Sequence, residues 1–382
     1  MDYQMIAQGA CEKIEEAVNQ FCVEGKPSEC RRYGSGHIND TFLLCTTDGE
    51  PGGEGHRYIL QRMNTLVFKD PKGLMQNISG VTAFLREQVA KAGGDVQREV
   101  LTLVKTKGGE DYYVDSSGLC WRMYLFITDA AGFDTVESEE DFYRSAEAFG
   151  HFQKLLDQYP VSSLTETIPD FHNTPKRYET FCRAVEEDAC GRARDVGSEI
   201  AFVTDRKEQM SIVMDKLNSG EIPWRVTHND TKLNNILLDN RTKRAVCVID
   251  LDTVMPGTAV FDFGDSIRFG ANTAEEDEKD LSRVSLSLPL YEAYIKGFLE
   301  GCGGSLTDEE VRLLPWGAKL MTLECGMRFL TDYLEGDKYF KVHRPGHNLD
   351  RARTQFALVA DMERKWDEMN RLAEQMILKE TL

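Results

Sequence analysis

The sequence has fewer basic than acidic residues and no long apolar run. Lysine and arginine together number 45 against 64 aspartates and glutamates, so the net charge at pH 7 is −19. This balance argues against nucleic acid and anionic membranes as partners, because both attract basic surfaces. No apolar run approaches the ~18 residues of a membrane-spanning helix, and residues 1–5 lack the basic-then-apolar pattern of a signal peptide. We therefore expect a cytoplasmic protein with no nucleic-acid or membrane partner.

Clustered cysteines and metal-binding histidine pairs are also lacking. The ten cysteines are scattered without a C-x-x-C pair, which is typical of reduced cytosolic thiols that pack as small core residues. His343 and His347 are close in sequence, but Pro345 and Gly346 break the helix that would place both imidazoles on one face. We expect a surface turn there and no metal site.

The chain is long enough, at 382 residues, for two domains with separate hydrophobic cores. The pattern predicts several strands and two helices before residue 127, and mostly helices after it. We expect an α+β protein with a small antiparallel β lobe at residues 1–127 and a mainly helical lobe at residues 128–382. The expected helices are 5–23, 71–92, 138–158, 174–189, 196–218, 278–300, 307–335 and 349–378, and the expected small-lobe strands are 41–45, 58–62, 99–106, 111–114 and 121–127.

The strongest chemical motif lies in the second half of the chain. Residues 228–235, His-Asn-Asp-Thr-Lys-Leu-Asn-Asn, spell H-x-D-x-x-x-x-N, the pattern of the catalytic loop in protein-kinase-like phosphotransferases. Predicted strands flank the loop, and a further strand ends in Asp250. Asp230 can orient an attacking hydroxyl and accept its proton, while Asn235 and Asp250 offer the oxygen ligands that Mg²⁺ prefers. The element order and this loop together predict a bilobal, protein-kinase-like fold with ATP between its lobes.

Two small-lobe segments are candidates for binding the nucleotide. Gly34, Ser35 and Gly36 lie between strand signals, where glycines let backbone N–H groups approach phosphate oxygens closely. A plain turn is the alternative for so short a motif. The adenine is expected beside Phe126 and Ile127, at the end of the last predicted strand.

Taken together, these motifs resemble the aminoglycoside phosphotransferase and choline kinase superfamily, and within it the bacterial N-acetylhexosamine 1-kinases. The resemblance spans nearly the whole chain, and its middle and C-terminal motifs are specific. It implies ATP-dependent, Mg²⁺-dependent phosphorylation of the anomeric hydroxyl of GlcNAc or GalNAc, which yields the sugar 1-phosphate. The stretches that carry it are 33–39 (YGSGHIN), 58–64 (YILQRMN), 228–270, 324–334 (ECGMRFLTDYL), 336–340 (GDKYF) and 347–349 (HNL).

The resemblance also implies roles for single residues. By it, Asp230 is the base toward the anomeric hydroxyl, and Asn235 and Asp250 bind Mg²⁺. Lys232, two residues past the base, would contact the phosphoryl group as it moves. Contacts to the sugar are implied at three further positions, Phe269, Arg328 and Tyr339.

Physical chemistry agrees with a sugar pocket but leaves alternatives open. A neutral sugar is held by hydrogen bonds to its hydroxyls and by aromatic rings against its C–H surface. Arg328 has a second interpretation, because Glu324 lies one helical turn earlier and would pair with it on the helix surface. For His37 three interpretations stay open: contact with phosphate, contact with the acceptor, or exposure to solvent.

Two positions depart from the usual kinase pattern. Most kinases carry a lysine for the α- and β-phosphates on the third small-lobe strand, where this chain has Gln61, or Arg62 if the register slips by one. The identity of the phosphate anchor is therefore open. Asp262-Phe263-Gly264 spells the metal-binding D-F-G triplet, but it comes twelve residues after Asp250 and not directly after a strand. By the resemblance, Asp262 instead braces the catalytic loop and caps a helix.

Three functions compete at this point. The first is a sugar 1-kinase, and the second is a related small-molecule kinase for another sugar, an aminoglycoside or choline. The third is a catalytically inactive kinase fold that serves as a binding module. Arg328 in the candidate acceptor pocket argues against cationic acceptors, and the presence of Asp230, Asn235 and Asp250 together argues against an inactive protein.

Overall fold

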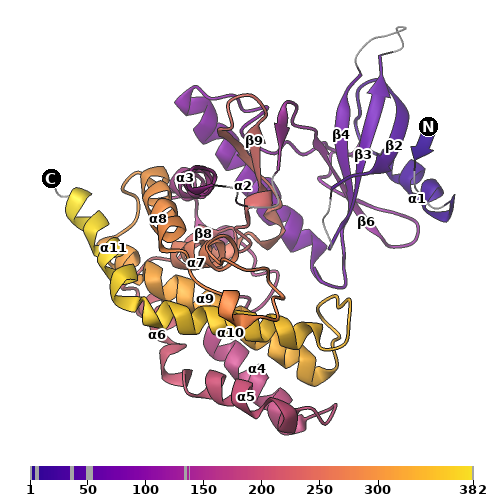
Figure 1. Ribbon diagram of the computed structural model, residues 1–382. Helices are drawn as coiled ribbons and strands as arrows, with labels where there is room; N and C mark the ends of the chain where they lie inside the picture. Colours follow the sequence, from indigo (N-terminus) through magenta and orange to yellow (C-terminus); the bar gives the residue numbers. More distant parts are fainter. Residues whose placement is uncertain are drawn as a thin grey trace. The chain divides into compact units, whose positions relative to one another are not determined.

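The computed structural model divides the chain into two compact units. The first comprises Met1–Ala130 and Ser162–Ile168, and the second comprises Ala131–Val161 and Pro169–Leu382. A sheet dominates the first unit and helices dominate the second (Figure 1), which confirms the predicted α+β fold. That residues 1–127 bind nucleotide and residues 128–382 carry catalysis stays a prediction. The structure describes residues 2–4, 8–34, 38–48, 55–132, 136 and 138–380.

The sheet of the first unit has six strands, and all neighbouring strands are antiparallel except β1 and β2. Its core lies on one face, where α1 (Gln8–Val18) packs Ile14 and Val18 against Leu60 and Trp121. The order across the sheet is β1 (Asp2–Gln4), β2 (Lys26–Arg32), β3 (Asp40–Thr47), β4 (Arg57–Arg62), β6 (Cys120–Leu125) and β5 (Tyr113–Val114).

Helix α2 (Pro71–Ala92) has the bounds that the sequence predicts. Asp70 accepts a hydrogen bond from the backbone N–H of Gly73, and Pro71 starts the first turn, where a missing N–H costs nothing. Gly93 ends the helix with φ of 78°, a left-handed conformation that glycine adopts without strain.

Two predictions for the first unit are wrong. Residues 99–106 form no strand, and Leu103 alone of them makes an isolated bridge to β6, with Tyr124. The segment leaves β6 after Val104, because Thr106 pairs instead with Phe21 near the end of α1. The predicted helix 5–23 is also shorter, since α1 ends at Val18.

Helices α3 (Glu139–Leu155) and α8 (Leu288–Cys302) pack closely in the second unit. Glycines at the contact make this possible: a Cβ on Gly150 would lie 2.1 Å from the carbonyl oxygen of Phe298, and one on Gly297 would lie 2.3 Å from that of Tyr143. The core beside them is aromatic, with Phe263, Tyr294 and Phe298 in mutual contact.

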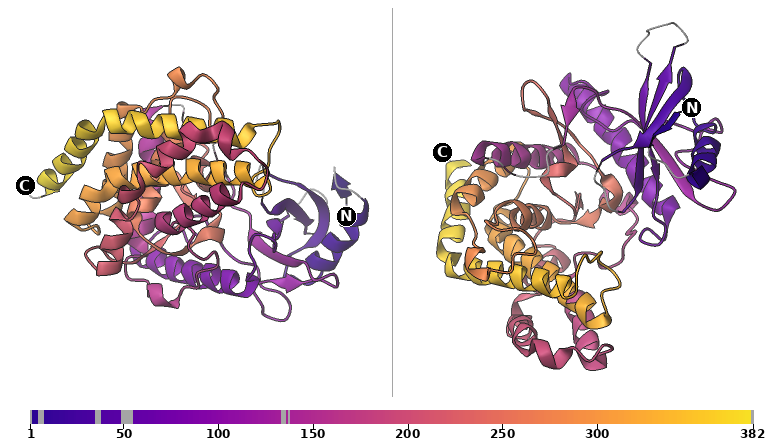
Figure 2. Two further views of the ribbon diagram at one scale, coloured as in Figure 1. Left: turned by 90° about the horizontal axis from the view of Figure 1, so that it is seen from below. Right: turned by 45° about the vertical axis from the view of Figure 1, so that its right-hand side comes forward.

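Helices α9 (Asp308–Glu335) and α10 (His347–Arg364) run side by side in the second unit (Figures 1 and 2). Helix α9 begins as predicted, with a capping box between Thr307 and Glu310. Helix α4 (Thr174–Glu187) also packs on α9 and agrees with its predicted range.

Three predicted helices of this unit are wrong in extent. Residues 196–218 form two short helices, α5 (Gly197–Thr204) and α6 (Ile212–Ser219), and the last predicted helix divides into α10 and α11 (Trp366–Glu380). Helix α8 starts ten residues late, because Ser287 caps its first turn and Pro289 favours a start there. His347 is buried at the start of α10 and pairs with Asp277, so the expected exposed turn does not include it.

The strands around the H-x-D-x-x-x-x-N motif are confirmed. β8 (Arg225–Thr227) enters the loop, β9 (Ile236–Asp239) leaves it, and β10 (Ala245–Val248) pairs with β9 before Asp250. β11 (Met255–Gly257) then pairs with β8 and leads into α7 (Ala259–Gly270). No helix among the described residues is both long and apolar enough to cross a membrane.

Candidate active site

One buried carboxylate, that of Asp262, holds the backbone at the start of the catalytic loop. Asp262 on α7 accepts hydrogen bonds from the backbone N–H groups of His228 (2.9 Å) and Asn229 (2.7 Å) and from the side chain of Gln153 (2.7 Å). Burial raises the pKa of Asp262, while these donors and the nearby His228 oppose the rise. The predicted bracing role is therefore confirmed. The helix cap is instead Thr258, whose hydroxyl accepts from the N–H of Val260.

Asn229 adopts a left-handed backbone conformation directly before the predicted base. Its φ is 64°, which is uncommon for a residue other than glycine, although asparagine tolerates it better than most. Its side-chain amide donates to the carbonyl oxygen of Thr253 at 2.8 Å. Together with the bond to Asp262, this contact fixes the peptide that leads into Asp230.

Asp230, Lys232 and Asn235 converge at the loop. The side-chain amide of Asn235 donates to the backbone oxygen of Asp230 at 2.8 Å and to its Oδ2 at 3.1 Å. Lys232 Nζ lies 2.7 Å from Asp230 Oδ1, and the negative charge of Asp230 raises the pKa of Lys232. The loop thus brings together a carboxylate, an ammonium group and an amide, as the motif predicts.

Asp250 lies beside Asn235. The backbone N–H of Ile249 donates to the carbonyl oxygen of Asn235 at 2.9 Å, and Asp250 follows in an exposed, left-handed position with φ of 59°. Because the amide nitrogen of Asn235 is engaged by Asp230, its side-chain oxygen is the group left for a cation. Carboxylate and amide oxygens are the protein ligands that Mg²⁺ prefers, so Asn235 and Asp250 fit this ion.

A second buried carboxylate, that of Asp265, holds the backbone of the loop at Thr231. Asp265 accepts from the backbone N–H of Thr231 at 3.1 Å and from the guanidinium of Arg268 at 2.9 and 2.7 Å. Burial alone would raise the pKa of Asp265, but the charges of Arg268 and Lys232 hold it below its usual value. Asp265 therefore stays ionised next to the loop.

Arg328 lies among three aromatic rings of the second unit. The centre of its guanidinium is 5.4 Å from the ring of Phe171, 5.5 Å from that of Phe340 and 5.9 Å from that of Tyr339. Within the described part of the chain, Arg328 makes no hydrogen bond and no ion pair. Tyr339 is 62% exposed, and Phe269 is partly exposed on the last turn of α7.

Glu324 makes no ion pair with Arg328 among the described contacts, although it lies one turn earlier on α9. Its Oε1 lies 2.9 Å from Nδ1 of His172, and its Oε2 accepts from the hydroxyl of Thr174 at 2.7 Å. Burial would raise the pKa of Glu324, but the hydrogen bond and charge of His172 hold it below its usual value. The alternative in which Glu324 forms a surface ion pair with Arg328 is therefore wrong.

The loop that carries Tyr339 and Phe340 is anchored by one side chain. Asp332 accepts from the backbone N–H groups of Lys338 (2.8 Å), Tyr339 (2.8 Å) and Phe340 (2.9 Å), and from the amide of Asn348 (2.9 Å). The motif residues of α9 and α10 thus meet around this carboxylate, and they hold two of the rings beside Arg328.

Phe171 and His172 were not predicted as site residues. Phe171 contributes one ring beside Arg328, and His172 joins Glu324 to the catalytic loop, where its Nε2 lies 3.2 Å from the carbonyl oxygen of Asn229. Neither belongs to a motif with a fixed spacing to Asp230. Only the fold places them at the site, so the sequence holds no signal that would have found them.

The predicted nucleotide residues lie in the first unit. Gln61 is directly opposite Arg122 in the β4–β6 pairing, accepts from its Nε at 2.9 Å and donates to the hydroxyl of Thr41. Phe126 contacts the ring of Tyr33 edge-on and the guanidinium of Arg57. Gly34 has φ of 76°, and Ile127 is buried. Ser35, Gly36 and His37 lie outside the described residues.

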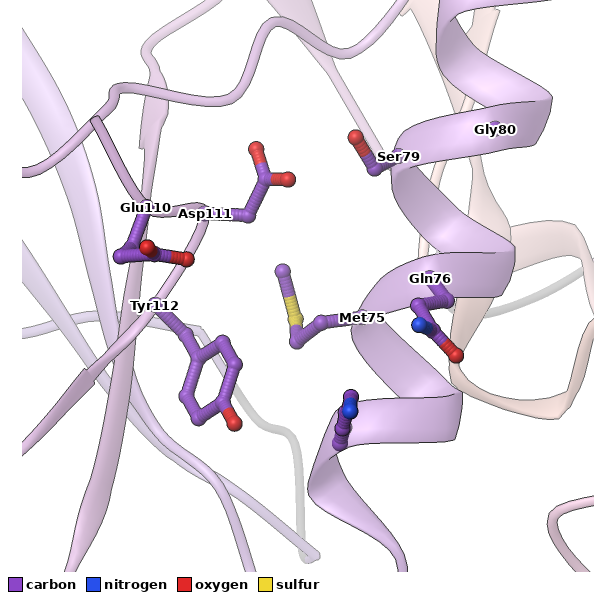
Figure 3. Close-up of a pocket in the computed structure, with 8 residues that line it drawn as sticks. Met75, Gln76, Ser79, Gly80, Glu110, Asp111 and Tyr112 are labelled. Carbon is purple, nitrogen blue, oxygen red and sulfur yellow. The ribbon is translucent and has the colours of Figure 1, made fainter.

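A cavity of about 330 Å³ also lies in the first unit, between α2 and residues 110–112 (Figure 3). Met75 and Tyr112 point into it, with Ser79 and Asp111 at its edge. None of the predicted site residues lines this cavity, so it has no part in the arrangement described above.

Comparison with known proteins agrees with this geometry. Residues 29–294 match the model of the phosphotransferase enzyme family. Similar solved structures include the microcompartment-associated aminopropanol kinase, with 16% identity, a TM-score of 0.60, and coverage of 94% of this chain and 98% of that one. An amicoumacin kinase in complex with AMP-PNP and Ca²⁺ has 14% identity, a TM-score of 0.58, and coverage of 94% and 93%.

An aminoglycoside phosphotransferase from Alicyclobacillus acidocaldarius has 13% identity, a TM-score of 0.61, and coverage of 97% of both chains. At these identities the likeness concerns the fold.

Proposed function

Because the chain belongs to the phosphotransferase enzyme family, we propose that it is an ATP-dependent kinase that phosphorylates the anomeric hydroxyl of an N-acetylhexosamine. The observation that supports a neutral sugar as the acceptor is the position of Arg328. Its guanidinium lies among three aromatic rings and has no ion-pair partner in the described part of the chain. The product is the sugar 1-phosphate.

The catalytic loop supplies the groups that phosphoryl transfer needs from a protein. Asp230 accepts the proton of the attacking hydroxyl, and Lys232 Nζ lies 2.7 Å from its carboxylate. Asn235 and Asp250 would hold Mg²⁺ through oxygen atoms. The bound MgATP supplies the γ-phosphoryl group and the charge that offsets its oxygens. That the amicoumacin kinase structure contains AMP-PNP and Ca²⁺ is consistent with a nucleotide and a divalent cation here.

The charge around Arg328 favours a neutral acceptor over a cationic one. Aromatic rings attract a cation to their faces, which is how quaternary ammonium ligands such as choline are recognised. Here Arg328 already lies at the three rings. A second arginine is close by: burial and the charge of Arg328 together lower the pKa of Arg177. A cationic aminoglycoside or choline would meet repulsion at this position.

A neutral sugar suits the same groups. The five N–H donors of an arginine can bond sugar hydroxyls and the carbonyl oxygen of an acetamido group. The exposed ring of Tyr339 can lie against the C–H surface of a pyranose. The names of solved relatives, an aminopropanol kinase and an aminoglycoside phosphotransferase among them, describe their own acceptors, so the sugar assignment depends on Arg328 and its rings.

ADP release across an acceptor panel tests the proposal. The panel contains GlcNAc, GalNAc and their methyl glycosides, glucose, galactose, an aminoglycoside, choline and aminopropanol, with Asp230→Asn as the inactive control. We expect turnover with the N-acetylhexosamines and none with their methyl glycosides, because those lack a free anomeric hydroxyl. Equal turnover of a methyl glycoside would place the phosphate on another hydroxyl. Turnover of the cationic acceptors alone would show instead a small-molecule kinase for an aminoglycoside, choline or a similar amine. No turnover with any member of the panel would favour a catalytically inactive binding module.

A further inference from the structure

His172 connects two parts of the site that are distant in sequence. Its Nδ1 lies 2.9 Å from Oε1 of Glu324 on α9, and its Nε2 lies 3.2 Å from the backbone oxygen of Asn229, the residue before the predicted base. The ring is largely buried, with 11% of the side chain exposed, between the rings of Phe171 and Phe261.

The two partners of this imidazole belong to different elements. One is the peptide carbonyl oxygen of Asn229, which can only accept a hydrogen bond, and the other is the buried carboxyl group of Glu324. The ring therefore bridges the catalytic loop and α9 through its two nitrogens.

We propose that His172 is a positioning residue whose imidazole links the carbonyl group before the predicted base to Glu324 on α9. This inference rests on the proposed phosphotransfer at Asp230, but not on the identity of the acceptor. The hydroxyl of Thr174 fixes the second oxygen of Glu324.

The bond to Asn229 completes the restraint on a strained peptide. The N–H of Asn229 is held by Asp262 and its side-chain amide by Thr253, so His172 supplies the remaining contact, to the carbonyl oxygen. The left-handed φ of Asn229 costs free energy and persists because its surroundings enforce it. Loss of one contact lets the peptide rotate, which displaces Asp230 from the hydroxyl that it must contact.

Other charged groups lie near this bridge. Arg328 lies on α9 together with Glu324, and Asp265 with its partner Arg268 lies on α7. Arg177 on α4 is bonded to the backbone oxygen of Phe171, the residue before His172. Among the described residues, Glu324 is the carboxylate bonded to the ring.

The kinetic test compares His172→Gln with His172→Phe in the full-length protein. Gln retains one donor, whereas Phe keeps the aromatic packing and removes both nitrogens. With MgATP and any acceptor that the enzyme turns over, we expect kcat to fall roughly ten- to a hundred-fold in His172→Phe, the usual effect of losing a hydrogen bond to a charged group. The KM for ATP and the KM for the acceptor should change less than about two-fold. His172→Gln should recover part of the loss.

A positioning role lowers kcat while both variants keep the fold of the wild type. Equal melting temperatures of the wild type, His172→Gln and His172→Phe would show that the variants fold. A kcat of His172→Phe close to that of the wild type, or equal losses in His172→Phe and His172→Gln, would overturn the proposal.

A spectroscopic measurement tests the proposal without any acceptor. The backbone ¹H–¹⁵N signals of Asn229 and Asp230 should move in His172→Phe, because the contact to the carbonyl oxygen of Asn229 is lost. Unmoved signals would overturn the proposal even if the enzyme is active on sugars. If the signals move and the sugar panel shows no turnover, the acceptor assignment fails while the positioning role of His172 stands.

Discussion

Glu324 and Arg328 lie one turn apart on α9, yet the carboxylate of Glu324 is bonded to His172 and Thr174. An acid and a base at this spacing normally pair along the helix surface. Here the acid is directed toward the catalytic loop, and the guanidinium is directed toward the rings of Phe171, Tyr339 and Phe340. The two side chains therefore serve different parts of the site.

Replacing Arg328 by alanine should damage acceptor use selectively. A hydrogen bond from a charged donor contributes about 1.5–3 kcal/mol, so kcat/KM for the sugar should fall roughly ten- to a hundred-fold. The KM for ATP should stay nearly constant. Steady-state kinetics with each substrate varied in turn provide the measurement. Arg312→Ala, an exposed arginine on the same helix with acidic neighbours, is the matched control. Equal damage to both substrates would show that Arg328 acts on the fold and not on the sugar.

Asp230→Asn keeps the shape of the side chain but removes its ability to accept a proton. Turnover should fall by ~10²–10⁴, the usual contribution of a general base. Nucleotide affinity, measured by calorimetry, should change little. Lys232 would lose its charged partner at 2.7 Å, so a Lys232→Met variant serves as the comparison for effects of charge alone. A mutant with near-normal turnover would remove Asp230 from the role of base.

Two aspartates are candidates for the metal, and they should respond differently to alanine. Asp250→Ala should abolish activity and weaken Mg²⁺-dependent nucleotide binding, because Asp250 is exposed beside Asn235. Asp262→Ala should mainly lower the melting temperature, since three buried donors lose their acceptor. If Asp262→Ala instead lost Mg²⁺ dependence with the melting temperature unchanged, the metal ligand would be the aspartate of the D-F-G triplet.

The loop next to Arg328 should loosen when Asp332 is replaced by alanine. Three backbone N–H groups lose their acceptor, and each unsatisfied donor costs about 1–3 kcal/mol when it stays buried. We expect a lower melting temperature and a KM for the sugar that rises more than the KM for ATP. Asp195→Ala, on the surface of the same unit, is the control. An unchanged sugar KM would mean that Tyr339 and Phe340 have no part in acceptor binding.

Stability should depend on pH through Asp361. This carboxylate is nearly buried, which would raise its pKa, but bonds from Lys365, Ser285, the N–H of Leu286 and Arg364 lower it to about 2. A depressed pKa stabilises the fold above the unfolded value of roughly 3.9 and loses that contribution as the pH falls toward the folded value. The gap in urea midpoint between wild type and Asp361→Asn should therefore be constant near neutral pH and shrink below about pH 4. A constant gap at all pH values would contradict this account.

The fold was predictable where local signals agreed with long-range packing. Pro71 and Gly93 bound α2 where the sequence places them, and Thr307 with Glu310 starts α9. The secondary-structure prediction was wrong where contacts between distant segments determine the backbone conformation. Residues 99–106 have the apolar alternation of a strand, but Thr106 pairs with Phe21, so the segment turns away from β6 after one bridge.

The loop chemistry was predictable because it lies on one continuous segment. Asp230, Lys232 and Asn235 are five residues apart at most, so their spacing alone brings them together. His172 and Phe171 reach the site from a different segment, and their contacts to Asn229 and Arg328 depend on how α4 packs on α9. No fixed spacing in the sequence indicates these contacts, so they could be identified only from the three-dimensional structure.

Gln61, bonded to Arg122 across the β4–β6 pair, leaves the strand without a primary amine where most kinases carry one. Reagents that acylate that amine would find an amide there, and the neighbouring guanidinium is a poor nucleophile because it remains protonated. In a mixed lysate such reagents would label the lysine-bearing kinases at this strand, whereas β4 of this protein offers them no amine. Its presence in a cell would then go unnoticed by profiling methods that depend on that one reactive side chain.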